Sequence, residues 1–561
     1  MTSWLNAPVG YTKNPVDPRP RTCSPSTSYA VSLPPPSRPM LHWLNRELCS
    51  QIAFFLNQHD TLSFALTCKD VASASLPRLY HKVVVDADYT EFRKEYDVPC
   101  TYIKSSYSFK KLVSRYTGRY PIHVFVVAKL PDTMKTFDEK VVGHLLHFFP
   151  TLHHLHTLHW LSDNFSLEYL RLLPSPEVVR ELRLNLNQRE HTREFVPFGF
   201  TNLTHFHARP FDDIKRLANL VNDVLCCADV DRLGHTLQSL KLSRHGLSEE
   251  ICPLHSRHLD RIFREEAAWH AQHSSFQGLR NIYCLFNHTK LHDVRLALTE
   301  LCLDDLFVYR DDAEVLAKAT DLSVLRKLEL RNIHEFAQWS YEPEVPSFLQ
   351  SLAPLVTELT HLRLDYRETR RDSVPSMLAS CQNLVELDLV IKLNDVKNQY
   401  VDPEESYLEY AQRLRELTQL VKLSVELNEE RPFGDVSLCT PVQIIQSIGR
   451  MPNLRFLRLN PTDSGQSLKQ FLHILKRLTR LEILDVFGTR AGGAPHMALG
   501  TTHPNIYDEW LKVQHVAFLF GDRQDSLRYV RINKCVFEYI ETAEPRDEID
   551  RWFEAQVRVG E

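Results

Sequence analysis

Glycine is scarce in this chain, with 16 among 561 residues, below the usual share of about 7%. Phosphate-binding loops need glycine so that backbone amides can approach the ligand, and neither a GxGxxG nor a GxxxxGK[ST] motif occurs. No apolar run reaches the roughly 18 residues of a membrane-spanning helix, so we expect no transmembrane segment. The sequence therefore argues against a nucleotide-binding loop and against insertion into a membrane.

The chain also lacks an excess of either charge, because 66 Lys and Arg face 71 Asp and Glu, for a formal net charge of −5. This balance gives no overall attraction to nucleic acid or to an anionic membrane, so we expect neither as a partner. The N-terminus has no apolar core of a secretory signal, and twelve cysteines are scattered without a CxxC pair. We therefore expect reduced thiols and a location in the cytoplasm, the nucleus or both.

The composition changes along the chain and indicates separate regions. Residues 1–39 hold nine of the 31 prolines and show little apolar periodicity, which predicts a disordered tail. Residues 40–82 carry apolar side chains at helical spacing and predict a module of three short helices, with Asp60 capping the second. We interpret residues 83–150 as a linker with irregular first repeats, and residues 541–561 as a capping helix.

A leucine template, LxxLxL, recurs between residues 151 and 540. Chance predicts roughly one strict copy over this span, and relaxed copies fill the gaps at a spacing typical of leucine-rich repeats. Helical patterns lie between the copies, so each unit consists of a strand, a turn and a helix that are stable only when stacked. The pattern predicts an α/β leucine-rich-repeat solenoid, with parallel strands on the concave face and helices on the convex face. Six strict copies begin at Leu237, Leu298, Leu325, Leu359, Leu384 and Leu454.

Two stretches, 243–278 and 488–526, interrupt the repeats, and we interpret both as insertions. A hydrolase site hidden in them is the weakest functional alternative, since no set of nucleophile, base and orienting residue is evident. His153, His156 and His159 are spaced by three, but no second cluster nearby has metal-ligand spacing, so we interpret them as solvated. We therefore predict no catalytic residue, no metal and no cofactor.

Residues 44–80 contain, in order, a leucine, an acidic residue, spaced aliphatic residues, an Asp, a Cys and a closing Leu-Tyr pair. They are Leu44, Glu47, Leu48, Ile52, Leu56, Asp60, Leu62, Cys68, Leu79 and Tyr80. This order resembles the pattern of the F-box family, except that Asn45 stands where the family usually has a proline that pre-sets the helix start. An F-box followed by leucine-rich repeats is a known domain order, and the two resemblances together cover most of the chain.

The resemblance implies a function. In the F-box family the module binds a Skp-type adaptor, which joins a cullin–RING ubiquitin ligase, while the repeats bind the protein target. The implied role is the substrate-recognition subunit of a Skp–cullin–F-box ligase, a protein that is not itself an enzyme. The alternative is a leucine-rich-repeat scaffold with no ubiquitin role. The implied adaptor contacts, which could instead fill the core of the module, are Leu44, Leu48, Ile52, Leu56 and Leu62.

Strand alternation predicts a surface for the target. In LxxLxL the middle and last leucines point inward, so the residues between and beside them face the concave side. Charges on a solvated strand face are the simpler explanation, but arginine suits bidentate capture of carboxylate or phosphate, so we predict a partner with an acidic segment. The predicted target contacts are Arg331, Arg363, Arg458 and Arg531. The acidic residues predicted to be exposed beside them are Glu329, Asp365, Asp388 and Asp485.

Overall fold

The computed structural model describes most of the predicted module and of the repeats. The described residues are 45–88, 100–134, 137–186, 199–209, 234–243, 295–335, 346–367, 372–392, 403–427, 440–460, 471–486, 526–532 and 535–538, with a few single residues between them. The predicted tail, Leu44, the larger part of both insertions and the predicted capping helix lie outside these residues.

Three helices form the N-terminal module: α1 (Arg46–Phe55), α2 (Gln58–Ala65) and α3 (Lys69–His81). Asn45 is the N-cap of α1, because its side-chain oxygen accepts a hydrogen bond from the Leu48 amide at 2.8 Å. The side chain of Asn45 therefore starts the helix, with no proline in its first turn.

The N-cap of α2 differs from the prediction. Asn57, not Asp60, holds this position, because its extended backbone lets the side chain accept from the Asp60 amide at 2.8 Å. Asp60 lies in the first turn instead, where the exposed amides of the helix favour a carboxylate.

The module has a small core of its own. Cys49 on α1 packs with Val71 and Ala74 on α3, and this cluster is separate from the core of the solenoid. Arg78, which is buried, donates from Nη2 to the carbonyl oxygen of Leu56 at 3.0 Å and so ties α3 to the end of α1.

The module joins the solenoid without a linker, because α3 ends at His81 and strand β1 (Lys82–Asp86) begins at the next residue. β1 pairs in parallel with β2 (Thr101–Ile103) and β3 (Val124–Lys129). In addition, the side-chain oxygen of Gln58 on α2 accepts from the Tyr102 amide at 2.9 Å. The helices of the module are therefore attached directly to the first strands of the sheet.

The strands form one continuous sheet, in which β1 lies between β2 and β3 and, from β3 onward, neighbours follow the order of the chain. All the described pairs are parallel except the last, β16 with β17, and the short β9 pairs with β10 beside β8. The further strands are β4 (Thr157–Phe165), β5 (Glu181–Leu186), β6 (His205–Arg209), β7 (Ser239–Ser243), β8 (Glu300–Asp304), β9 (Phe307–Val308), β10 (Lys327–Glu335), β11 (His361–Arg367), β12 (Glu386–Lys392), β13 (Lys422–Leu427), β14 (Phe456–Leu459), β15 (Ile483–Val486), β16 (Tyr529–Ile532) and β17 (Cys535–Glu538).

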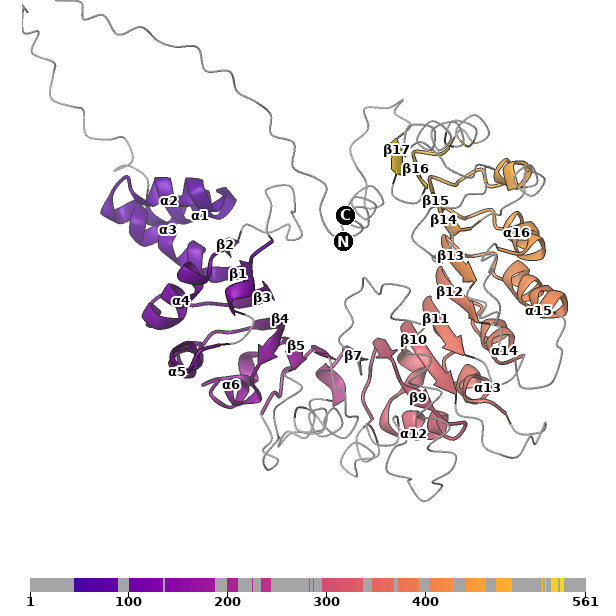
Figure 1. The fold of residues 1–561 in the computed structure, drawn as a ribbon, viewed down its shortest axis with the longest axis horizontal. Helices are drawn as coiled ribbons and strands as arrows, with labels where there is room; N and C mark the ends of the chain where they lie inside the picture. The colour runs from indigo at the N-terminus through magenta and orange to yellow at the C-terminus, as the bar shows by residue number, and fades with distance from the viewer. Residues whose placement is uncertain are drawn as a thin grey trace, which may run out of the picture.

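The strands line the inner side of an arc and the helices its outer side (Figure 1). No helix in the described part of the chain is both long and apolar enough to cross a membrane. The outer α-helices are α4 (Ser106–Arg115), α5 (Glu139–Phe148), α6 (Leu167–Arg171), α12 (Asp312–Ala319), α13 (Phe348–Leu352), α14 (Ser373–Ser380), α15 (Pro403–Glu416) and α16 (Val442–Ile448). Short 3-10 helices occur at Asp132–Met134, Phe149–Thr151, Pro176–Val178, Leu322–Val324 and Ala353–Leu355.

The leucines of the template stack in register through the core. Leu328 and Leu330 of β10 lie opposite Leu362 and Leu364 of β11, and all four are buried. Each strand thus buries the side chains that face the helices and leaves the alternate ones on the concave side. This arrangement confirms the predicted α/β leucine-rich-repeat-like solenoid.

Candidate functional site

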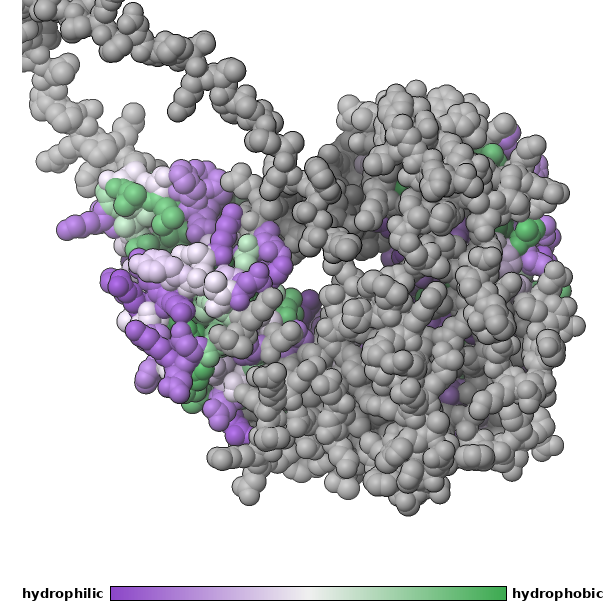
Figure 2. Space-filling view, viewed as in Figure 1, coloured by the Kyte–Doolittle hydropathy of each residue, from purple (hydrophilic) through white to green (hydrophobic). Residues whose placement is uncertain are grey.

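The first candidate surface is the apolar face of the N-terminal module. Leu48 and Ile52 on α1 are 45% and 38% exposed, and Leu62 on α2 is 45% exposed. None of the three belongs to the core of the module. Hydrophobic residues accordingly show at the surface of this end of the molecule (Figure 2). Leu48 and Ile52 are four residues apart and therefore share one side of the helix.

The resemblance did not point to all of this surface. Phe55 at the end of α1 and Leu66 after α2 are more exposed than the predicted residues, at 82% and 87%. The sequence offers one sign of the exposure of Phe55, which directly follows another phenylalanine. Adjacent helix positions lie about 100° apart, so the two rings cannot both face one small core. Leu56, in contrast, is half-buried beside Arg78.

The second candidate surface is the concave side of the sheet, where charged side chains alternate from strand to strand. Glu300 on β8 lies 3.1 Å from Lys241 on β7 and 2.7 Å from Lys327 on β10. Burial alone would raise the pKa of Glu300, but hydrogen bonds from Lys327 and Ser239 and the charge of both lysines lower it to about 2. This carboxylate therefore stays ionised and holds neighbouring repeats together.

The four predicted arginines face this concave side, and each has a carboxylate partner. Nε of Arg363 lies 3.4 Å from Asp388, and Arg331 pairs with Glu329 on its own strand. At the far end of the arc, Arg458 and Arg531 both approach Asp485, and Nε of Arg531 donates to it at 2.9 Å.

The predicted exposure of two carboxylates on this face is wrong. Glu329 is 7% exposed and Asp485 is 2% exposed. Both are covered by the longer cationic side chains that pair with them, Lys327 and Arg331 in one case and Arg458 and Arg531 in the other. The concave face thus presents guanidinium and ammonium groups above buried acids.

A column of histidines runs along the edge where the first strands begin. His81, His123 and His156 directly precede β1, β3 and β4, and the ring of His123 lies 4.6 Å and 5.0 Å from the other two. Burial, and then the neighbouring imidazoles, lower the pKa of His123 to about 4, so the column is neutral at pH 7. Among the described residues no group of three or more His, Cys, Asp or Glu side chains has a metal-binding arrangement.

The expectation of solvated histidines is therefore wrong at two of the three positions. His156 belongs to this column, and Nε2 of His159 lies 3.0 Å from Glu181. Only His153 of the three is exposed. Parallel pairing explains the difference, because it brings equivalent positions of successive repeats into contact.

The fold and its two surfaces define a class, a leucine-rich-repeat-like solenoid with a three-helix module at its N-terminal end. No family model and no curated protein matches the chain. Among solved structures the chain is similar to an internalin, inlF, from Listeria monocytogenes strain 4b F2365, with 15% identity over 58% of this chain and 77% of that one and a TM-score of 0.25. The class assignment rests on the strand pairing and the stacked leucines, not on this likeness.

Proposed function

We propose that this protein is the substrate-recognition subunit of a Skp–cullin–F-box ubiquitin ligase. The observation that carries the proposal is the apolar face of α1 and α2, where Leu48, Ile52 and Leu62 are exposed instead of filling the core of the module. Contiguous apolar side chains at a surface mark an interaction site. On this proposal a Skp-type adaptor covers the face and connects the chain to a cullin–RING ligase in the cytoplasm or nucleus.

The solenoid binds the protein target on its concave side in this proposal. Arg331, Arg363, Arg458 and Arg531 contact the target, and the carboxylates beside them hold the guanidinium groups in place. The chain performs no chemistry itself. It brings the target close to the ligase and thereby raises the effective concentration of the two reactants.

The double variant Leu48→Asp and Ile52→Asp tests the adaptor contact. We expect the variant to lose capture of a purified Skp-type adaptor, because two carboxylates buried in an apolar contact cost several kcal/mol, on the order of 4 or more. Its melting temperature should hardly change, because both side chains are exposed in the free chain. Isothermal titration calorimetry and a thermal melt measure the two properties.

The matched control is Leu355→Asp with Leu408→Asp, two apolar residues of similar exposure that lie on the outer side of the solenoid. This control should bind the adaptor as the wild type does. Undiminished binding by the folded Leu48→Asp, Ile52→Asp variant would contradict the proposal and favour a scaffold with no ubiquitin role.

A further inference from the structure

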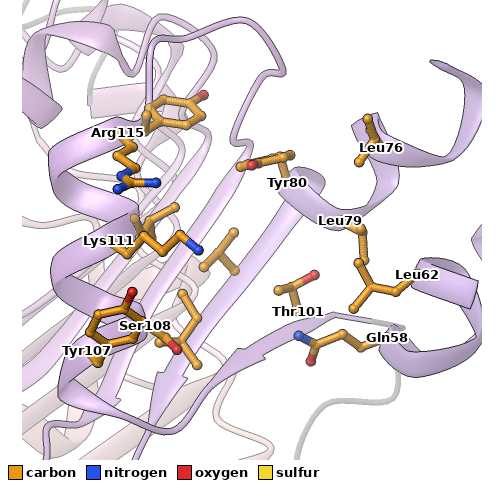
Figure 3. A pocket seen from close by; sticks show the side chains of 14 residues that line it. Gln58, Leu62, Leu76, Leu79, Tyr80, Thr101, Tyr107, Ser108, Lys111 and Arg115 are labelled. Atoms are coloured by element: carbon orange, nitrogen blue, oxygen red, sulfur yellow. The ribbon is translucent and has the colours of Figure 1, made fainter. Parts of the chain in front are cut away.

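A groove lies where the module meets the first outer helix of the solenoid (Figure 3). Helices α2 and α3 form one wall, α4 forms the other, and β1 and β2 contribute to the floor. Its volume is about 440 Å³, within the range of roughly 300–1,000 Å³ that is typical of ligand sites. Such sites often lie at junctions between structural units.

The lining of the groove is apolar on one side and cationic on the other. Leu62, Leu76 and Leu79 project from the module, whereas Lys111 and Arg115 project from α4 on the opposite wall (Figure 3). The two cations are four residues apart and so share one face of their helix. None of the fourteen lining residues is acidic.

Lys111 and Arg115 also differ from the cations of the concave face in having no ion-pair partner within the described part of the chain. Like charges four residues apart on a helix repel each other, so each of the two cations would gain from an added anion. An anion entering the groove would find both groups available, whereas each concave arginine already has a carboxylate beside it.

The walls are held in place before any ligand arrives. Gln58 links α2 to β2 through its hydrogen bond with the Tyr102 amide. The ring of Tyr80 stacks on Tyr120 at 5.5 Å, and the hydroxyl of Tyr116 donates to the carbonyl of Tyr120 at 2.6 Å. A site formed in advance binds with less loss of conformational entropy.

We infer that this groove docks an acidic segment of the captured target, in which an apolar side chain is flanked by carboxylates. The apolar side chain would pack on Leu76 and Leu79 of α3, beside the adaptor face that includes Leu62, while the carboxylates pair with Lys111 and Arg115. The groove is open to solvent, with the exposed ring of Tyr107 at its rim, which suits a peptide better than an enclosed small molecule. The inference rests on the proposed function only for the source of the segment, since binding itself requires no adaptor.

The test uses the full chain and a fluorescein-labelled synthetic peptide with two leucines flanked by glutamates. We expect the variant Lys111→Glu with Arg115→Glu to bind the peptide at least about tenfold more weakly in an anisotropy titration, a loss of about 1.4 kcal/mol. Added salt should weaken binding to the wild type, because the cations are exposed. A peptide with serine in place of both leucines should also bind poorly.

Lys476→Glu with Arg477→Glu is the control, because it reverses an exposed cationic pair far from the groove. This control should keep wild-type affinity, and so should the Leu48→Asp, Ile52→Asp variant, even though the latter loses the adaptor. Three results would overturn the inference: no binding of the peptide to the wild type, an equal loss in the Lys476, Arg477 control, or displacement of the peptide by saturating adaptor.

Discussion

Arg531 and Arg363 lie on the same face of the sheet but in different surroundings. The side chain of Arg531 is 20% exposed and holds both oxygens of the buried Asp485. That of Arg363 is 38% exposed and approaches the half-exposed Asp388 at 3.4 Å. The first pair is therefore expected to contribute more to the stability of the fold, and the second to leave its guanidinium group more available to the target.

We predict that Arg531→Gln lowers the free energy of unfolding by about 2 kcal/mol, because Asp485 would stay buried with only Arg458 beside it. Arg363→Gln should cost less than about 1 kcal/mol and should weaken capture of the target. Urea denaturation of both variants measures the contrast. Equal destabilisation by the two substitutions would show that the concave pairs are equivalent and that this distinction is wrong.

The histidine column makes stability depend on pH. The pKa of His123 is lowered to about 4 in the folded chain, against about 6.5 when unfolded. The unfolded chain therefore binds the proton more tightly, so this stabilisation is complete above pH 6.5 and is lost as the pH falls toward 4. Arg78 and Lys82 near His81, and Arg180 near His156, oppose protonation further.

We predict that the free energy of unfolding falls by a value on the order of 1 kcal/mol between pH 7 and pH 5. Urea denaturation at each pH measures it. Carboxylates such as Glu300 titrate lower, because the pKa of Glu300 is lowered to about 2 in the folded chain. The stability that they contribute is therefore lost only below about pH 4.5, the pKa of a free glutamate. His123→Asn should flatten the pH dependence, whereas His153→Asn, which alters an exposed ring outside the column, should not. The same slope in wild type and His123→Asn would contradict the assignment.

Single residues also show where sequence patterns stop being informative. The burial of Leu328 and Leu330 could be predicted, since alternation along one strand is enough to decide it. The burial of Glu329 could not, because it depends on the cations that cover it. Nor could the column around His123, which depends on the register between strands separated by whole repeats.

At the scale of elements, helical spacing predicted the three helices of the module but not which of their apolar residues are buried. A core as small as that around Cys49 leaves most of the apolar residues of α1 and α2 outside it. Spacing alone could not tell which side of α1 faces that core, and the structure places Leu48 and Ile52 outside it. Capping was equally ambiguous, because Asn57 and Asp60 are both residues that favour helix starts.

The first strands of the sheet are harder to predict from the sequence than the later ones. Residues 83–150, predicted as a linker with irregular first repeats, contain β2, α4, β3 and α5 together with most of β1. β1 and β3 bury valines and Phe125 where later strands bury leucine, so the leucine template does not detect them. Their β-branched residues favour strands, yet only stacking on the later repeats decides which face is buried.

At the scale of the whole molecule, the junction at His81 and Lys82 fixes the orientation of the module on the solenoid. We predict that a six-residue Gly/Ser segment inserted between these residues would leave the adaptor face and the concave face intact, because each lies within one part. It would weaken binding of the acidic peptide in the groove, whose walls belong to both parts. The inserted segment behaves as a flexible coil and would let the two parts reorient. The same segment inserted after Leu427, within the solenoid, serves as the control.

A rigid junction has a consequence for the outcome of the proposed reaction. Two surfaces held at a constant separation would hold a bound target at one distance from the enzyme that delivers ubiquitin, so only lysines within that reach would be modified. The junction would then select the acceptor site as well as the target. Mass spectrometry of the modified lysines in a reconstituted reaction should therefore find a few sites with the wild type and a broader set with the insertion at His81. An unchanged set of sites would mean that the choice of lysine is made elsewhere.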